Sequence, residues 1–175
     1  LADIRIAVAS DCAFSFIYHA NLNLLQMMGA ELVFFSPLDD TVLPKADSLY
    51  LPGGYPELHL EKLAANQSIR DAIRIHHAAG KPIVAEGGGM LYLLTTLSSN
   101  NGQQATMVDI LQGRATMQTN LVNVGFHFAT FTGGKLRGHT FHHTKLETAA
   151  KPSALTQPVK NKHRCEPLFC EGRLT

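Results

Sequence analysis

Strand-like and helix-like segments alternate through the first hundred residues, and this alternation constrains the fold more than any other feature. Four short apolar runs rich in β-branched or aromatic residues predict strands. They cover residues 4–9, 31–35, 48–51 and 82–86. Segments with helical spacing lie between them, and such an alternation predicts a mainly parallel sheet with helices on both faces, an α/β fold.

Capping signals suggest where the helices begin and end. Asn21 is expected to cap the first helix, and Gly29 is expected to end it. The second helical stretch is broken near Asn66, after which we expect a helix from a Ser68 cap to a stop at Gly80. In the first helix, the residues with the spacing of one buried face are Leu22, Leu25 and Met28.

The pattern changes after the fourth strand. A glycine triplet opens a predicted helix over residues 90–97. Residues 114–131 and 135–146 alternate in polarity, which predicts antiparallel strands at an edge of the sheet. Residues 151–162 are polar with two prolines and are expected to form a mobile loop. We therefore predict a sheet of five or six strands with an antiparallel extension.

Composition excludes several classes of protein. The 175 residues suit a single domain, and 45% hydrophobic with 17% charged residues is typical of a globular chain. The net charge of +1 gives no broad electrostatic case for binding nucleic acid or an anionic membrane. No apolar run reaches the roughly 20 residues of a membrane span.

Three cysteines without paired spacing argue against a disulfide framework. They favour a reducing cytoplasm, and no signal peptide is expected before the first strand. Because the chain begins at Leu1 and ends in EGRLT, we expect residues 1–175 to be one domain cut from a longer protein.

Two glycine-rich turns follow predicted strands, over residues 52–57 and 85–90. Sites in open α/β sheets form beyond the carboxyl ends of the strands. The backbone N–H groups of such turns can stabilise an oxyanion. The second turn has the strand–turn–helix form of a nucleophile elbow, but its tip is Gly87, which offers no side chain. From the residues alone, a structural turn, an anion or phosphate site and a degraded elbow all remain open.

Four motifs in fixed order connect the chain to a known family. They are FSFIY at 14–18, FFSPL at 34–38, LPGGYPELH at 51–59 and RGHTFHHT at 137–144. Together they resemble the amidotransferase domain of cobyrinic acid a,c-diamide synthases. This resemblance implies a class I glutamine amidotransferase fold, which is flavodoxin-like. It also implies a preceding synthetase domain that uses ATP and Mg²⁺, with no cofactor or metal in this domain. The whole enzyme would amidate corrin carboxylates in cobalamin synthesis, with ammonia taken from glutamine.

The resemblance also assigns roles to the glycine turns. Gly53, Gly54, Tyr55 and Gly88 become candidates for holding glutamine or its oxyanion. The family elbow reads AECGG, whereas this chain reads AEGGG, so Gly87 occupies the position of the nucleophilic cysteine. Glycine has no atom that can form the glutamyl thioester. Glu86 is expected to point away from the tip because side chains alternate along a strand, and the role of Cys12 is left open.

The family's general base is a histidine, and CEPLFCEGRLT resembles the stretch just before it. We therefore expect the base to lie beyond Thr175 rather than to be mutated. His139, His142 and His143 belong to a different motif. For these three histidines we favour a role in packing or hydrogen bonding, then a substrate-side or interdomain role, and last a metal site. His76 and His77 are expected to face solvent.

Two interpretations of Gly87 compete. Either glutaminase activity has been lost, or Gly87 was introduced into a normal enzyme. Three functions follow: an amidotransferase domain inactive in this form, a non-catalytic domain that binds glutamine or an anion and contacts its partner domain, and an unrelated flavodoxin-like domain with a phosphorylated cofactor. Cobyrinic acid, hydrogenobyrinic acid and a nickel sirohydrochlorin all remain open as substrates.

Overall fold

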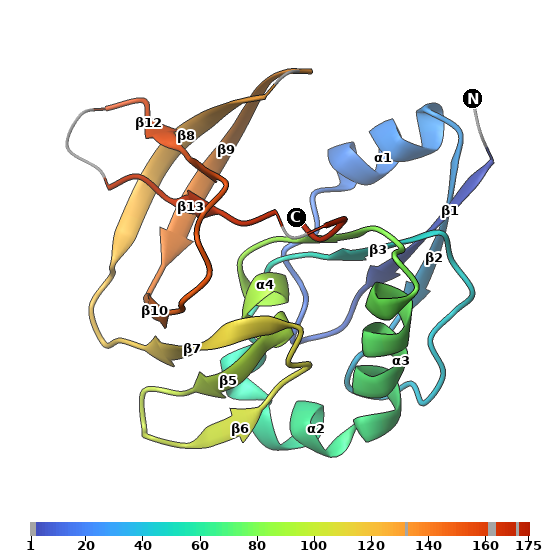
Figure 1. The fold of residues 1–175 in the computed structure, drawn as a ribbon, viewed down its shortest axis with the longest axis horizontal. Helices are drawn as coiled ribbons and strands as arrows, with labels where there is room; N and C mark the ends of the chain where they lie inside the picture. The colour runs from blue at the N-terminus through green and yellow to red at the C-terminus, as the bar shows by residue number, and fades with distance from the viewer. Residues whose placement is uncertain (1–2, 132, 161–163, 171) are drawn as a thin grey trace.

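The computed structural model describes residues 3–131, 133–160, 164–170 and 172–175. Its main sheet has four parallel strands in the order β2-β1-β3-β4 (Figure 1). These strands are β1 (Ile4–Ala9), β2 (Ala30–Phe35), β3 (Ser48–Leu51) and β4 (Ile83–Ala85). All four match predicted strands. The expected five or six strands were too many, because the segments after β4 enter other sheets.

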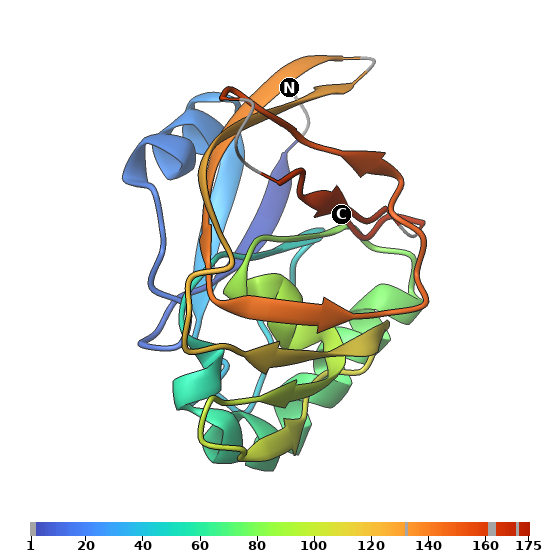
Figure 2. The ribbon, with the colours of Figure 1, turned by 90° about the vertical axis from the view of Figure 1, so that its left-hand side faces the viewer.

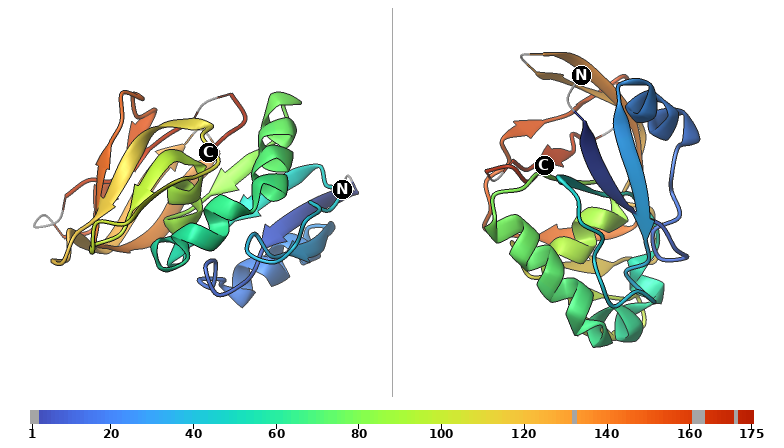
Figure 3. Two further views of the ribbon diagram at one scale, coloured as in Figure 1. Left: turned by 90° about the horizontal axis from the view of Figure 1, so that it is seen from below. Right: turned by 90° about the vertical axis from the view of Figure 1, so that its right-hand side faces the viewer.

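Helices cover both faces of this sheet, as predicted (Figures 1 and 3). The helix α1 (His19–Met27) buries Leu22 against Val8 and Tyr50 on one face. The 3₁₀ turn η1 (Pro56–Leu58) and the helices α2 (Leu60–Ala65) and α3 (Gln67–Ala78) follow β3. Their apolar side chains join Leu49, Leu51 and Ile83 in the larger core on the opposite face. Successive strand residues thus point to opposite layers, as the pleat requires.

The helix ends differ from two of the four cap assignments. Helix α1 begins at His19 after Tyr18, so Asn21 lies inside it, and Met28 is 56% exposed. Asn66 caps α3 by accepting from the N–H of Ile69 at 3.4 Å, which places Ser68 within the helix. The amide of Asn66 also donates to the carbonyls of Pro37 and Asp40, so tertiary contacts select it as the cap. Gly29 and Gly80 follow their helices with φ of 96° and 69°, as expected of left-handed glycines.

The helix after the glycine triplet is shorter than predicted. Helix α4 (Gly88–Leu93) gives way to β5 (Leu94–Ser98), where Thr95 and Thr96 favour a strand. Strand β5 opens a second sheet in the order β10-β7-β5-β6. The other strands of this sheet are β6 (Gln104–Thr106), β7 (Leu111–Met117) and β10 (Thr144–Glu147).

The antiparallel extension is confirmed, but it forms sheets of its own rather than an edge of the main sheet. Strands β8 (Asn123–Phe131) and β9 (Gly134–His142) pair along their full lengths as a long hairpin. Strand β12 (Gln157–Pro158) pairs with β8, and β11 (Ala154–Leu155) pairs with β13 (Pro167–Leu168). Most of the predicted loop at 151–162 therefore takes part in or borders short strands, while residues 161 and 162 lie outside the described residues.

The last described residues return to the main sheet. Leu174 forms a parallel bridge with Ile83, and the N–H of Ala85 donates to the carbonyl of Thr175 at 2.7 Å. The chain thus runs beside β4 in the direction of the turn that follows it. Figure 2 shows this segment arriving from the β8–β9 side of the molecule.

Candidate active site

The two glycine turns lie side by side. Strands β3 and β4 are adjacent and parallel, with Leu51 opposite Ala85, so the turns that follow them emerge together. A Cβ atom built on Gly87 would lie 3.7 Å from the Cα of Gly53. The sequence prediction that both turns contribute to one site at the carboxyl edge of the sheet therefore fits this geometry.

Gly87 has the backbone of a sharp strand-to-helix turn. Its φ is 49° and its ψ is −112°, a conformation that strains residues with a side chain. The N–H of Gly89 donates to the carbonyl of Glu86 at 2.8 Å, and the N–H of Leu91 donates to that of Gly87 at 3.1 Å. Strand, tight turn and helix thus follow within six residues, which is the form of a nucleophile elbow.

Gly87 differs from the glycines around it in the room that each has for a side chain. A Cβ on Gly54 would lie 2.1 Å from the carbonyl oxygen of Ala13, and one on Gly89 would lie 2.0 Å from that of Leu51. A Cβ on Gly88 would lie 2.8 Å from the backbone of Gly54. These three glycines are required by backbone packing, whereas Gly87 has only an ordinary contact and faces open space. The tip of the turn therefore has room for a side chain that this chain lacks.

Several backbone N–H groups of the two turns donate to no acceptor among the described residues, and those of Gly54 and Gly88 are among them. The close packing of Gly88 on Gly54 puts the two groups in the same neighbourhood. Paired N–H donors of this kind can bind a carbonyl oxygen that becomes negatively charged. The carbonyl of Gly53 is in contrast occupied, because it accepts from the N–H of Phe16 at 3.0 Å.

Two aromatic rings stand beside the glycine turns. Phe16 and Tyr55 meet edge to face with ring centroids 4.8 Å apart, and both residues are 42% exposed. The ring of Phe16 also lies 3.3 Å from a Cβ built on Gly53. Tyr55, a candidate glutamine contact from the sequence, thus lies beside the glycine turns together with Phe16.

Asp11 organises the loops on this edge and was not singled out from the sequence. Its carboxylate accepts from the N–H groups of Ala13 and Phe14 within its own loop. It also accepts from the hydroxyl of Ser36 at 2.8 Å and the N–H of Leu38 at 3.0 Å, beyond β2. An acidic residue just after a strand and before a tight loop was the available signal. The neighbouring Cys12 is exposed, and the three cysteines are free thiols.

The profile of the CobB/CobQ-like glutamine amidotransferase domain matches residues 5–174 of this chain. The chain belongs to that family. The relationship expected from the four motifs is thereby confirmed, and the glycine turns can be considered as parts of an amidotransferase domain.

Relatives of this domain are longer proteins. The chain is 50% identical over 175 residues to hydrogenobyrinate a,c-diamide synthase of Pseudomonas aeruginosa, with all of this chain and 40% of that protein covered. It is 53% identical over 175 residues to the protein of the same name from Stutzerimonas stutzeri, of which 41% is covered. It is 42% identical over 176 residues to cobyrinate a,c-diamide synthase of Herminiimonas arsenicoxydans, again with 40% covered. The chain thus spans about two fifths of the length of these relatives.

Solved structures support the fold assignment. A chain of PurLQS from Thermotoga maritima superposes with a TM-score of 0.60 at 19% identity, covering 91% of this chain and 76% of that one. A glutamine amidotransferase from the same organism gives 0.64 at 12% identity, covering 99% and 74%. The predicted class I amidotransferase-like architecture is confirmed by these matches.

Glu86 of the amidotransferase domain points away from the elbow tip, as expected from alternation. Its carboxylate accepts from the hydroxyl of Tyr50 at 3.1 Å, on the face of the sheet that α1 covers. Burial, together with the nearby Glu86 carboxylate, raises the pKa of Tyr50. Glu86 therefore anchors the base of the elbow rather than replacing the missing nucleophile.

The ring and hydrogen-bond contacts of the histidines of the RGHTFHHT segment are with the hairpin and its surroundings, and His143 also interacts electrostatically with Glu57 of the first glycine turn. His139 meets Phe126 edge to face at 5.1 Å. The Nε2 of His142 lies 2.9 Å from the Oε1 of Glu166, and this hydrogen bond raises the pKa of His142. His143 packs edge to face on Phe141 at 5.8 Å.

The expectation that His76 faces solvent is wrong, since it is 7% exposed. Its Nε2 lies 3.2 Å from the carbonyl of Pro82, and burial lowers its pKa. This contact joins the end of α3 to the start of β4, which a sequence pattern does not reveal. His77 is partly exposed.

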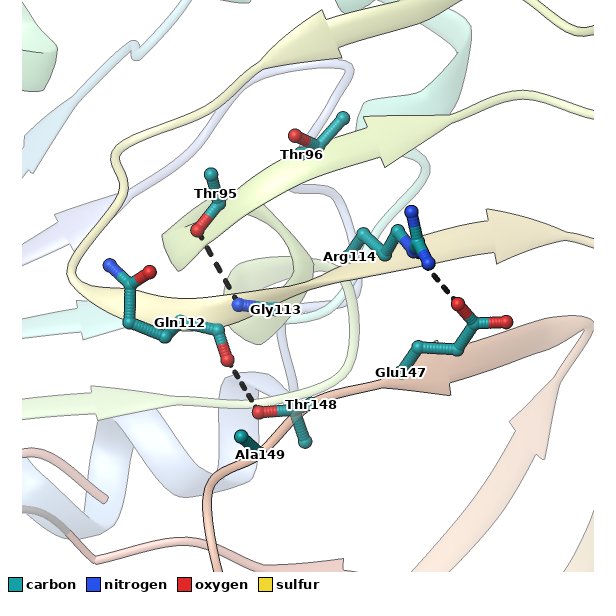
Figure 4. Close-up of a pocket in the computed structure, with 8 residues that line it drawn as sticks. All are labelled: Thr95, Thr96, Gln112, Gly113, Arg114, Glu147, Thr148 and Ala149. Atoms are coloured by element: carbon teal, nitrogen blue, oxygen red, sulfur yellow. Dashed lines mark hydrogen bonds and ion pairs between the residues drawn. The ribbon is translucent and has the colours of Figure 1, made fainter.

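A shallow hollow of about 580 Å³ lies in the second sheet, and none of its lining residues belongs to the glycine turns (Figure 4). Thr95 Oγ1 accepts from the N–H of Gly113 in its floor, and Arg114 pairs with Glu147 at 2.8 Å on its rim. Because the hollow shares no residue with the elbow, we do not assign it to glutamine. Among the residues that the structure describes, no cluster of three or more His, Cys, Asp or Glu side chains has a metal-binding arrangement. Within the same residues, no helix has the length and apolar character needed to span a membrane.

Proposed function

We propose that this domain is the glutamine-binding part of an ATP-dependent a,c-diamide synthase that acts on cobyrinate or hydrogenobyrinate. The names of relatives at 42–53% identity support this assignment. ATP, Mg²⁺ and most contacts with the corrin belong to the part of the protein outside these 175 residues, in a synthetase domain of the same protein. The exposed free cysteines fit work in the reducing cytoplasm.

We further propose that the domain, with Gly87, does not hydrolyse glutamine. Hydrolysis in this family requires a thiolate that attacks the amide carbon and expels ammonia to form a glutamyl thioester, which water then hydrolyses to glutamate and the free thiol. The observation that carries the proposal is the elbow backbone of Gly87, with space for a side chain and no side chain present. A supporting general base would follow residues 165–175 in the longer protein, where the chain already runs along β4 toward the elbow.

A second function is binding without reaction. The N–H groups of Gly54 and Gly88 remain without acceptors among the described residues, and Tyr55 and Phe16 still stand beside them. These groups can hold the glutamine carbonyl or an anion without a nucleophile. In this form the domain would serve the synthetase as a structural partner or as a guide for ammonia.

The deciding experiment uses the longer natural protein with ATP, Mg²⁺ and, in separate assays, cobyrinic acid and hydrogenobyrinic acid, and compares glutamine with ammonium as nitrogen donor. We expect amidation with ammonium only. Gly87→Cys should restore the glutamine-dependent reaction, and Gly87→Ala is the matched control because it introduces the same Cβ without the thiol. Glutamine-dependent turnover by the Gly87 protein would refute the inactivity, and no amidation with either donor would refute the synthase assignment.

Binding without reaction is tested by calorimetry of the 175-residue chain with glutamine. Heat of binding without ammonia release supports a retained glutamine site. An absence of binding at millimolar glutamine would mean that the remaining groups do not hold the ligand.

A further inference from the structure

The carboxylate of Asp11 uses its two oxygens on two different loops. Its Oδ1 accepts from the N–H groups of Ala13 and Phe14 at 2.8 and 3.2 Å, within the loop that follows β1. Its Oδ2 accepts from the hydroxyl of Ser36 at 2.8 Å and from the N–H of Leu38 at 3.0 Å, in the loop that follows β2. A carboxylate has about four acceptor positions, so these four donors use its whole capacity and fasten one loop to the other.

The loop that Asp11 holds, residues 11–16, supports the first glycine turn, and we call it the Asp11 loop. A Cβ atom built on Gly54 would lie 2.1 Å from the carbonyl oxygen of Ala13. The N–H of Phe16 donates to the carbonyl of Gly53 at 3.0 Å. The backbone of the first turn therefore rests directly on the backbone of the Asp11 loop.

The same contacts continue to the second glycine turn. A Cβ atom built on Gly88 would lie 2.8 Å from the backbone nitrogen and oxygen of Gly54. The ring of Phe14 in the Asp11 loop lies 5.3 Å from the ring of Tyr92 on α4, and neither residue is exposed. The Asp11 loop, the first turn and the start of α4 are thus packed against one another without space for adjustment.

We propose that Asp11 is a positioning residue for glutamine. Its carboxylate fixes the Asp11 loop, and this loop sets where the N–H groups of Gly54 and Gly88 lie. The inference rests on the proposed function, in which those two N–H groups hold the glutamine carbonyl. Donors that are already in place stabilise a developing oxyanion better than donors that must move first. Asp11 acts through the loop rather than by contact with the ligand.

An Asp11→Asn substitution tests this role because it keeps the size of the side chain. Asparagine has one acceptor oxygen, and its amide nitrogen is a donor. The hydroxyl of Ser36 can rotate to accept from that nitrogen, whereas the N–H of Leu38 can only donate. On whichever side the amide nitrogen lies, at least one backbone N–H therefore loses its acceptor, and one of the two loops is released.

The first measurement needs no ligand and follows the amide signals of the 175-residue chain by nuclear magnetic resonance. We expect the signals of Gly54 and Gly88 to shift in Asp11→Asn. A shift at Gly88, two contacts away from the Asp11 loop, reports a displacement passed on through Gly54. The amide of Phe16 should exchange its hydrogen about tenfold faster or more, because its hydrogen bond to the first turn opens more often.

The matched control is Asp47→Asn, which makes the same change in charge and size. The carboxylate of Asp47 also accepts from a backbone N–H, that of Arg5 at 2.9 Å. Asp47 directly precedes β3, whereas the first glycine turn follows that strand. The control should leave the signals of Gly54 and Gly88 and the exchange of Phe16 as they are in the unchanged chain.

The second measurement uses the longer protein with Gly87→Cys and compares glutamine with ammonium as nitrogen donor. Asp11→Asn should lower the ratio of glutamine-dependent to ammonium-dependent amidation about tenfold or more, because only the glutamine reaction uses the two N–H donors. A role in stability alone would lower both reactions by the same unfolded fraction and leave the ratio constant. Ser36→Ala removes a single donor to Asp11 and should act in the same direction, with a smaller effect.

Three results would overturn the proposal: unchanged amide signals at Gly54 and Gly88 in Asp11→Asn, equal changes in Asp47→Asn, or a constant ratio of the two amidation reactions. The diamide synthase assignment is judged separately, by amidation with ammonium in the longer protein. If that reaction fails, the proposed function is refuted, whereas the amide signals still decide whether Asp11 places the two N–H groups.

Discussion

Substituting the elbow glycines one at a time should separate backbone packing from the missing nucleophile. Gly87 and Gly89 are two residues apart, yet an added Cβ meets very different surroundings. At Gly89 it would overlap the carbonyl of Leu51, at 2.0 Å from the oxygen and 2.6 Å from the carbon. At Gly87 the nearest atom is 3.7 Å away. The same substitution, to Ala, is therefore predicted to have unequal effects.

The expected magnitudes follow from these contacts. For Gly87→Ala the cost is backbone strain at a φ of 49°, about 1–3 kcal/mol, partly offset by the lower entropy of the unfolded chain. For Gly89→Ala the overlap is with backbone, so α4 must move off β3. Overpacking of this kind costs about 3 kcal/mol or more. We therefore expect the second variant to be less stable by at least about 1 kcal/mol.

Urea unfolding followed by far-ultraviolet circular dichroism measures the difference. The free energies of unfolding of the two variants can be compared directly when both depend on urea concentration with the same slope. Gly80→Ala is a useful reference, because Gly80 also has a positive φ, 69°, with open space around it. If Gly89→Ala proves as stable as Gly87→Ala, the close approach of α4 to β3 is wrong, and so is the argument that Gly87 alone has room for a side chain.

Three further outcomes are expected. Glu166→Gln should destabilise the fold mainly between about pH 4.5 and 6.5. The pKa of His142 is raised, so the stability that His142 contributes is lost as pH rises through its folded-state pKa. The pKa of Glu166 is lowered by His142 and Asn123 despite its burial, so the stability that Glu166 contributes is lost as pH falls through its folded-state pKa. If the pair contributes nothing, urea titrations will show that the difference in free energy of unfolding between the Glu166→Gln variant and the unchanged chain does not change with pH. Asp11→Ala should cost about 2–3 kcal/mol in thermal or urea unfolding, because four donors lose their acceptor. Asn66→Ala should cost about 1 kcal/mol or more and Ser68→Ala close to nothing, and a reversed order would contradict the observed cap of α3.

The parallel sheet could be predicted because its signals are local. Each of the four strands is a short apolar run closed by a turn, and Gly29 and Gly80 mark helix ends through their own backbone preferences. The family could be recognised for a similar reason, since the motif at 51–59 is a contiguous stretch. The absent side chain at Gly87 is likewise visible in the sequence.

Only tertiary contacts decided the remaining features. Asn66 rather than Ser68 became the cap because Pro37 and Asp40 offer it carbonyl acceptors from a distant loop. His76 is buried, and its Nε2 lies 3.2 Å from the carbonyl oxygen of Pro82, six residues away. The boundary between α4 and β5 at Leu94 needs pairing with β7 in addition to the local strand preference of Thr95 and Thr96, and residues 90–97 do not specify that partner.

The site shows the same division between sequence and structure. The sequence by itself determined the first four strands and the helices between them, the two glycine turns and the absence of a nucleophile at residue 87. The tertiary structure decided that the turns meet, that Gly54, Gly88 and Gly89 admit no Cβ while Gly87 does, and that Asp11 ties two loops together. Glycine and turn preferences are properties of the local backbone, whereas steric space, burial and hydrogen-bond partners arise only when segments far apart in the chain come into contact.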